Sequence, residues 1–183
     1  MAIGQIEFNI ETQRILKLLA NDIYDSPYAL LRENVQNAYD AILMRQKRES
    51  FDPKIEICVK QGVITITDNG IGMTREVIEN NYWKAGSSGK NNPEARAAGV
   101  VGTFGIGAMA NFGICTALEI ESRYYEGDIT YRSTAHREKL EIGKKCIDLG
   151  EITKRIEPGT TVKATLEEGI YVNMEEAESY LQQ

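Results

Sequence analysis

The chain has 183 residues, 42% of them hydrophobic and 26% charged, which is ordinary for one globular domain over residues 1–183 with a core of its own. Its formal net charge of −6 argues against direct nucleic-acid binding, because such surfaces usually carry a basic stripe. The sequence shows no apolar run long enough to cross a bilayer, no secretory signal and no cysteine spacing typical of zinc or redox pairs, so we expect a cytoplasmic protein that does not bind membranes.

The first half of the chain predicts helices followed by a hairpin. Polar and apolar residues first alternate, as in a short edge strand, and apolar side chains then recur at helical spacing. Ser26 before Pro27 is a typical start for a second helix, and Gln61-Gly62 separates two β-rich runs. The expected elements are a strand over residues 5–10, helices over 11–24 and 27–46, and strands over 54–60 and 63–67.

The second half predicts a long loop and further strands. Residues 86–107 are rich in Gly, Ser, Asn and Ala, and loops of this length within a compact domain are usually functional lids or disordered. We expect a helix to begin over residues 107–112, strands over 117–125, 129–134 and 161–166, and the start of a helix in the acidic tail over 167–183. This order predicts an α+β sandwich with helices over one face of a sheet. The short tail suggests an excised domain of a longer protein.

Three polar residues of the second helix share nearly one face. Asn37 and Asp40 lie four and seven residues after Glu33, close to one and two helical turns. Apolar neighbours can bury the helix beside them, so the polar stripe borders the core. The amide oxygen of Asn37 can bind Mg²⁺, and the carboxylate of Glu33 can deprotonate an attacking water. The alternative is a solvated helix face with an incidental Asn.

Asp68 follows a β-rich run and precedes Gly70 and Gly72. A carboxylate at a strand end can accept a hydrogen bond from an exocyclic amine such as that of adenine, and glycines let the backbone approach a flat base closely. Gly159 and Thr160 open a late strand, where the threonine hydroxyl could support Asp68 or an ordered water. The alternatives are an ordinary Asp-Asn-Gly turn and a β-branched strand residue after a turn.

A glycine-rich segment over residues 99–107 runs into the helix expected from residue 107. Backbone N–H groups and the positive end of a helix dipole suit a polyphosphate, and a structural turn is the alternative. A dinucleotide fingerprint over residues 105–110 is a weaker interpretation, because no clear strand leads directly into it. A Walker A loop is excluded at residues 86–91, where the spacing is wrong and Lys90 has no Ser or Thr after it.

Together these blocks resemble the GHKL ATPases, the superfamily of gyrase, heat-shock chaperone, histidine kinase and mismatch-repair ATPases. They are most similar to the N-terminal domain of the ninety-kilodalton heat-shock chaperones. The residues that carry the resemblance are Leu31-Arg32-Glu33, Asn37-Ala38-Tyr39-Asp40-Ala41, Asp68-Asn69-Gly70-Ile71-Gly72-Met73, Gly102-Thr103-Phe104-Gly105-Ile106-Gly107 and Gly159-Thr160. The resemblance implies a Bergerat fold: a two-layer α/β sandwich with a mixed, mainly antiparallel sheet, helices on one face and a mobile lid over ATP.

The resemblance also implies a role for each matching residue. Glu33 corresponds to the general base, Asn37 to the Mg²⁺ ligand, and Asp68 to the partner of adenine, with Thr160 supporting it. Residues 84–91 would form part of the lid. The base and ribose pocket would be lined by Asp40, Ala41, Gly72 and Met73, and the phosphates would be surrounded by Gly102, Thr103, Phe104, Gly105, Ile106 and Gly107.

The function implied is an ATP-driven conformational machine of chaperone type, which binds ATP or ADP with Mg²⁺ and hydrolyses ATP to ADP and phosphate. Its partners would be the remaining domains of the parent protein, client proteins and a second copy in an ATP-dependent homodimer. Because a middle domain supplies a catalytic arginine in the chaperones, we expect slow turnover by this chain alone. One alternative is a nucleotide-dependent sensor with little hydrolysis. Another is a histidine kinase, which ranks last because no helix carries a suitable acceptor histidine.

Overall fold

The computed structural model describes residues 11, 14, 27–84, 108 and 111–182. The strand expected over residues 5–10, nearly all of the helix expected over 11–24 and the loop over 86–107 lie outside the described residues. The described elements are α2 (Pro27–Gln46), β1 (Ile55–Lys60), β2 (Val63–Asp68), α3 (Arg75–Val77), a π-helical turn (Ile78–Tyr82), a 3₁₀ turn (Asn111–Gly113), β3 (Cys115–Arg123), β4 (Thr130–His136), a second 3₁₀ turn (Arg137–Lys139), β5 (Ile147–Ile152), β6 (Gly159–Leu166) and α6 (Met174–Leu181).

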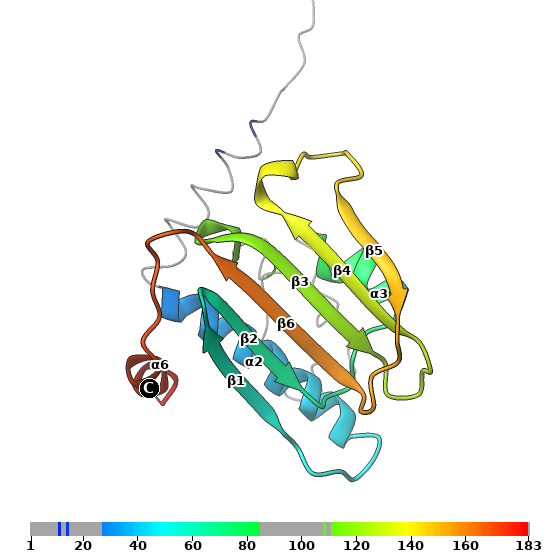
Figure 1. Ribbon diagram of the computed structural model, residues 1–183. Coiled ribbons are helices and arrows are strands. Elements are labelled where there is room, and N and C mark those ends of the chain that lie inside the picture. The colour runs from blue at the N-terminus through cyan, green and yellow to red at the C-terminus, as the bar shows by residue number, and fades with distance from the viewer. Residues whose placement is uncertain (1–10, 12–13, 15–26, 85–107, 109–110, 183) are drawn as a thin grey trace, which may run out of the picture.

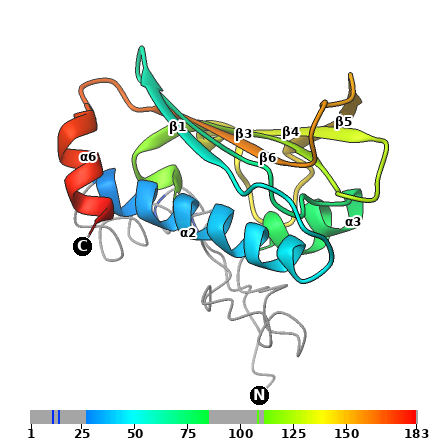
Figure 2. The same cartoon turned by 90° about the horizontal axis from the view of Figure 1, so that it is seen from below.

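The described strands form one sheet in the order β1-β2-β6-β3-β4-β5, and each described pair is antiparallel. β6, although last in the chain, lies between β2 and β3 (Figure 1). Helices α2 and α3 lie on one side of the sheet, and the other side carries none of the described helices (Figure 2). The predicted α+β sandwich with helices on one face of a mainly antiparallel sheet is therefore confirmed.

The helix-covered face of the sheet carries the core. Apolar side chains on β2, β6 and β3 form two rows across the strands, with Ile66, Val162 and Ile120 in one row and Ile64, Ala164 and Leu118 in the next. Leu30, Leu31 and Ala38 of α2 are buried in the same cluster. Full burial of a Leu or Ile side chain stabilises a fold by roughly 1.5–3 kcal/mol, so these rows hold α2 against the sheet.

Two residues further along each strand, the same face becomes polar. Asp68 ends β2, Thr160 follows the first residue of β6, and Ser122 of β3 is registered opposite Thr160. All three are buried. Buried polar groups need hydrogen-bond partners, so these three side chains must find partners outside the apolar core.

The opposite face of the sheet carries charged pairs. Lys163 Nζ lies 2.8 Å from Glu119 Oε1, and an Arg132 nitrogen lies 2.6 Å from Glu121 Oε1. Ion pairs of this exposed kind contribute on the order of 0–1 kcal/mol. This face is therefore the outer, water-facing layer of the sheet, and the polar row on the helix-covered face is the exception.

The structure confirms most of the predicted elements that it describes. α2 has the expected bounds, and β1 and β2 are joined by a two-residue turn in which Gln61 (φ 52°) and Gly62 (φ 73°) are both left-handed, as a tight hairpin requires. The strands expected over 117–125, 129–134 and 161–166 correspond to β3, β4 and β6 with shifted ends. β5 is not predicted from the sequence, because Gly150 in its interior weakens the strand signal.

Two helical expectations were incomplete. Of the helix expected over residues 107–112, the described parts are Ala108, which is helical, and the 3₁₀ turn that begins at Asn111. The acidic tail contains a complete short helix, α6, whose first N–H groups are capped by the side chain of Asn173. The rings of Tyr180 and Tyr28 lie 5.9 Å apart and join α6 to α2. No helix among the described residues is long and apolar enough to span a membrane.

Candidate functional site

The polar stripe of α2 borders the core, as the sequence predicts. Asp40 is fully buried, while Glu33 and Asn37 are half-buried. The side-chain amide of Gln36 donates to Asp40 Oδ1 over 3.0 Å. Because a buried carboxylate is costly without such partners, the stripe is not a simple solvated helix face.

The turn after β2 is packed between α2 and β3. The N–H group of Ile71 donates to the carbonyl oxygen of Ala41 over 2.9 Å. A Cβ atom at Gly70 would lie 2.6 Å from the carbonyl carbon of Ala41, and one at Gly72, where φ is +66°, would lie 1.9 Å from the carbonyl oxygen of Arg123. Close contact with protein backbone therefore requires both glycines, whereas the sequence suggested that they allow close approach to a flat base.

Asp68 is 5% exposed and has an asymmetric set of hydrogen bonds. Its Oδ1 accepts from the N–H groups of Gly70 (2.8 Å) and Thr160 (3.3 Å). Burial raises the pKa of the carboxyl group to about 6, although these N–H groups and the charge of Arg155 act in the opposite direction. Within the described part of the chain, no donor to Oδ2 is found. The end of β2 thus offers a carboxylate oxygen to a further N–H donor.

Ser122, which is not among the residues predicted from the sequence, connects the turn to β6. Its Oγ accepts a hydrogen bond from the N–H group of Met73 over 2.8 Å and lies 2.8 Å from Thr160 Oγ1. Thr160 therefore supports Asp68 through its backbone N–H group, while its hydroxyl pairs with Ser122. A serine at an inward position of an otherwise apolar strand alternation is the signal that could have identified Ser122.

Two arginines hold the backbone of the same turn. Arg155, from the loop before β6, donates to the carbonyl oxygens of Glu121 (2.9 Å) and Asp68 (3.4 Å). Burial lowers the pKa of the Arg155 guanidinium. Arg45, near the end of α2, donates to the carbonyl oxygen of Asn69 over 2.6 Å. Neither contact can be predicted from the sequence, because both depend on the tertiary fold.

A buried amide pair ties α2 to the chain that follows the glycine-rich segment. Asn34 Nδ2 donates to Asn111 Oδ1 over 2.8 Å, and Asn111 Nδ2 donates to the carbonyl oxygen of Ala108 over 3.2 Å. Asn34 follows Glu33 in the sequence, so this connection meets α2 beside the predicted general base. The predicted phosphate-binding residues lie outside the described residues; they are Gly102, Thr103, Phe104, Gly105, Ile106 and Gly107.

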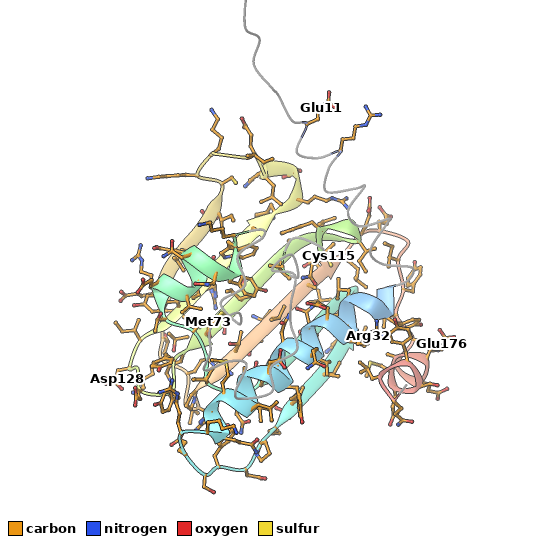
Figure 3. The ribbon with its side chains drawn as sticks, turned by 180° about the vertical axis from the view of Figure 1, so that it is seen from behind. Glu11, Arg32, Met73, Cys115, Asp128 and Glu176 are labelled. Carbon is orange, nitrogen blue, oxygen red and sulfur yellow. The ribbon has the colours of Figure 1, made fainter. Side chains whose placement is uncertain are left out.

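The predicted site residues that the structure describes extend from Glu33 along α2 to the turn after Asp68. At 1.5 Å per residue, Glu33 lies about 12 Å along the helix from Ala41, which contacts the turn. Figure 3 shows Met73, at the end of the turn, between α2 and α3 on the helix-covered side. Five of the predicted residues gather where the turn meets α2 and β6: Ala41, Asp68, Gly72, Met73 and Thr160. Asp40 precedes Ala41 on α2. A site of this length fits an extended ligand.

Comparisons with known proteins identify the family to which the chain belongs. The model of the family described as "Histidine kinase-, DNA gyrase B-, and HSP90-like ATPase" matches residues 24–164, and the chain belongs to this family. The GHKL resemblance drawn from the motifs is therefore confirmed.

Named relatives narrow the similarity further. The chain is 30% identical over 186 residues to Chaperone protein HtpG of Nitratidesulfovibrio vulgaris, a match that covers 88% of this chain and 28% of the relative. It is also 30% identical over 186 residues to Chaperone protein HtpG of Borreliella afzelii, with 92% of this chain and 28% of the relative covered. The chain thus spans less than a third of the length of these relatives.

Proposed function

We propose that this chain binds ATP or ADP between α2, the turn after Asp68 and the start of β6. The observation that carries the proposal is the buried carboxylate of Asp68, whose Oδ1 is fixed by two backbone N–H groups. Its Oδ2 receives no hydrogen bond from the described residues, and the exocyclic amine of adenine has the N–H group to fill that position. Membership of a family of ATPases supports this choice of ligand.

The residues around Asp68 are proposed to shape the pocket for the base and ribose. Gly72 and Met73 continue the turn, Ala41 contacts it from α2, and the buried Asp40 precedes Ala41 on the same helix. The fixed backbone of the turn supports this role, because a preorganised pocket loses less entropy when it binds a ligand.

Hydrolysis is assigned to the stripe on α2. Glu33 is the proposed general base, since its half-buried carboxylate can hold a water and take its proton. The amide oxygen of Asn37, one helical turn further, fits Mg²⁺, which prefers oxygen ligands and keeps several waters. When bound, Mg²⁺ neutralises negative charge on the phosphate oxygens. Backbone N–H groups between Gly102 and Gly107 are proposed to hold the phosphates.

The proposed activity is hydrolysis of ATP to ADP and phosphate within a chaperone-like conformational cycle. These 183 residues would act as one ATP-binding domain in a longer protein, with client proteins and a second copy in an ATP-dependent homodimer as partners. The name of the relatives supports the chaperone role, and slow turnover by the chain alone stays a prediction. A nucleotide sensor with little hydrolysis is the alternative, and Glu33 disfavours it because a sensor needs no general base.

Exchange of Glu33 separates these two functions. ATP affinity and steady-state phosphate release are measured for the wild type, Glu33→Ala and the control Glu76→Ala, whose carboxylate is exposed on α3. We expect Glu33→Ala to keep its ATP affinity and to lose roughly 10²–10⁴-fold in turnover, the usual contribution of a general base. The control should change neither quantity. Unchanged turnover in Glu33→Ala would remove Glu33 as the base, and ATP binding by the wild type without measurable phosphate release would favour the sensor.

A further inference from the structure

Three groups of the proposed pocket converge on the hydroxyl of Ser122. The N–H group of Met73 lies 2.8 Å from Ser122 Oγ, Thr160 Oγ1 lies 2.8 Å from it, and the carbonyl oxygen of Gly159 lies 3.2 Å from it. Ser122 has no exposed surface. Its described partners therefore determine which way the protons in this cluster point.

The protons can be assigned from the chemistry of each group. A serine hydroxyl has one proton and two acceptor lone pairs. The N–H group of Met73 can only donate, so it occupies one lone pair of Ser122. The carbonyl oxygen of Gly159 can only accept, so it takes the Ser122 proton. The second lone pair of Ser122 then accepts the proton of the Thr160 hydroxyl, which is the arrangement that satisfies all three contacts.

This arrangement changes what Thr160 can offer to a ligand. Its only hydroxyl proton is held by Ser122, so Oγ1 presents lone pairs alone. Thr160 is also adjacent to Asp68, because its N–H group donates to Asp68 Oδ1. An ionised carboxylate is likewise an acceptor only. The ends of β2 and β6 therefore present two neighbouring acceptors, which bind an N–H group and repel an oxo group.

We propose that Ser122 is a positioning residue that sets base specificity: by accepting the proton of Thr160, it makes the pocket select a purine with an exocyclic amine over a purine with an oxo group at the same position. This inference rests on the proposed function, because it concerns the same pocket. Ser122 acts through Thr160 and Met73 and need not touch the nucleotide.

Binding of ATP and inosine triphosphate tests this inference, since the two nucleotides differ by an amine and an oxo group on the base. Calorimetry measures both affinities for the wild type, Ser122→Ala, Thr160→Val and the double variant. We expect the wild type to prefer ATP and Ser122→Ala to reduce the ATP-to-inosine-triphosphate affinity ratio by about tenfold, the effect of one hydrogen bond. In the Thr160→Val background, the further change Ser122→Ala should leave the ratio unchanged.

The outcomes separate a directing role from a merely structural one. A structural role of Ser122 would weaken both nucleotides equally and leave the ratio of affinities constant, which would overturn the inference while the proposed function stands. If Ser122→Ala does not fold, Thr160→Val decides alone, because it keeps the backbone N–H group and should also lower the ratio. An unchanged ratio in Thr160→Val overturns the inference. Failure of the folded wild type to bind either nucleotide overturns the proposed function and this inference with it.

Discussion

Replacement of Asp68 with Asn should stabilise the ligand-free protein at neutral pH although it removes a proposed binding group. Burial raises the pKa of the Asp68 carboxyl group from 3.8 to about 6 in the folded protein. The charged form is therefore less favourable in the folded state than in the unfolded chain. An Asn amide is neutral, and its oxygen can still accept from the N–H groups of Gly70 and Thr160.

The magnitude and the pH range follow from these two pKa values. Their difference corresponds to about 3 kcal/mol, at about 1.4 kcal/mol for each pH unit. Below pH 3.8 the carboxyl group is protonated in both states and costs nothing; above pH 6 it is ionised in both states and the cost is complete. The contribution of Asp68 to the free energy of unfolding should therefore fall as pH rises from about 4 to about 6.

Urea unfolding of the wild type and Asp68→Asn, without nucleotide, at pH 4 and pH 7.5 measures this effect. The stability of the variant relative to the wild type should rise by about 2.5 kcal/mol between the two pH values, because a small part of the cost is already present at pH 4. The comparison across pH cancels every effect of the substitution that does not involve titration. A relative stability that is the same at both pH values would refute the reasoning, because Asp68 would then carry no titration-linked cost.

Two further predictions concern the same turn. Gly72→Ala should destabilise the fold by more than about 2 kcal/mol in thermal or urea unfolding, because the added Cβ atom would meet the carbonyl oxygen of Arg123. The control is Gly143→Ala, which is also at positive φ but has nothing within 4 Å of the added Cβ atom, and it should cost only about 1–2 kcal/mol. Equal losses in the two variants would contradict the packing explanation. ATP affinity should fall about tenfold between pH 7 and pH 5, because the base amine needs ionised Asp68, and a flat pH profile would contradict that role.

The local parts of the fold could be predicted from the sequence. Ser26-Pro27 and Gln61-Gly62 act on their immediate neighbours, and the bounds of α2 and the β1–β2 hairpin follow from them. Asp68 was predicted to lie at a strand end, and it does. Its role as a ligand acceptor stays a prediction, as do the roles of Glu33 and Asn37.

The supports of the candidate site could not be predicted in the same way. Ser122 meets Met73 and Thr160 only because β6 inserts between β2 and β3, a pairing that no local pattern determines. The contact of Arg155 with the turn depends on the same insertion. The need for Gly70 arises from the closeness of α2, whereas the sequence alone suggested closeness to a flat ligand. Each of these contacts joins segments far apart in the chain.

Calorimetric titration of the protein with Mg²⁺ and ATP at pH 7.5 tests the central claim most directly. The wild type and Asp128→Asn should bind with the same affinity, because Asp128 (Figure 3) is an exposed residue of the β3–β4 loop. It pairs with Lys154. Asp68→Asn should bind at least about tenfold more weakly, because it replaces a charged acceptor of the base amine with a weaker one. Absence of binding by the folded wild type, or equal affinity in Asp68→Asn, would contradict the assignment of Asp68 as the group that recognises adenine.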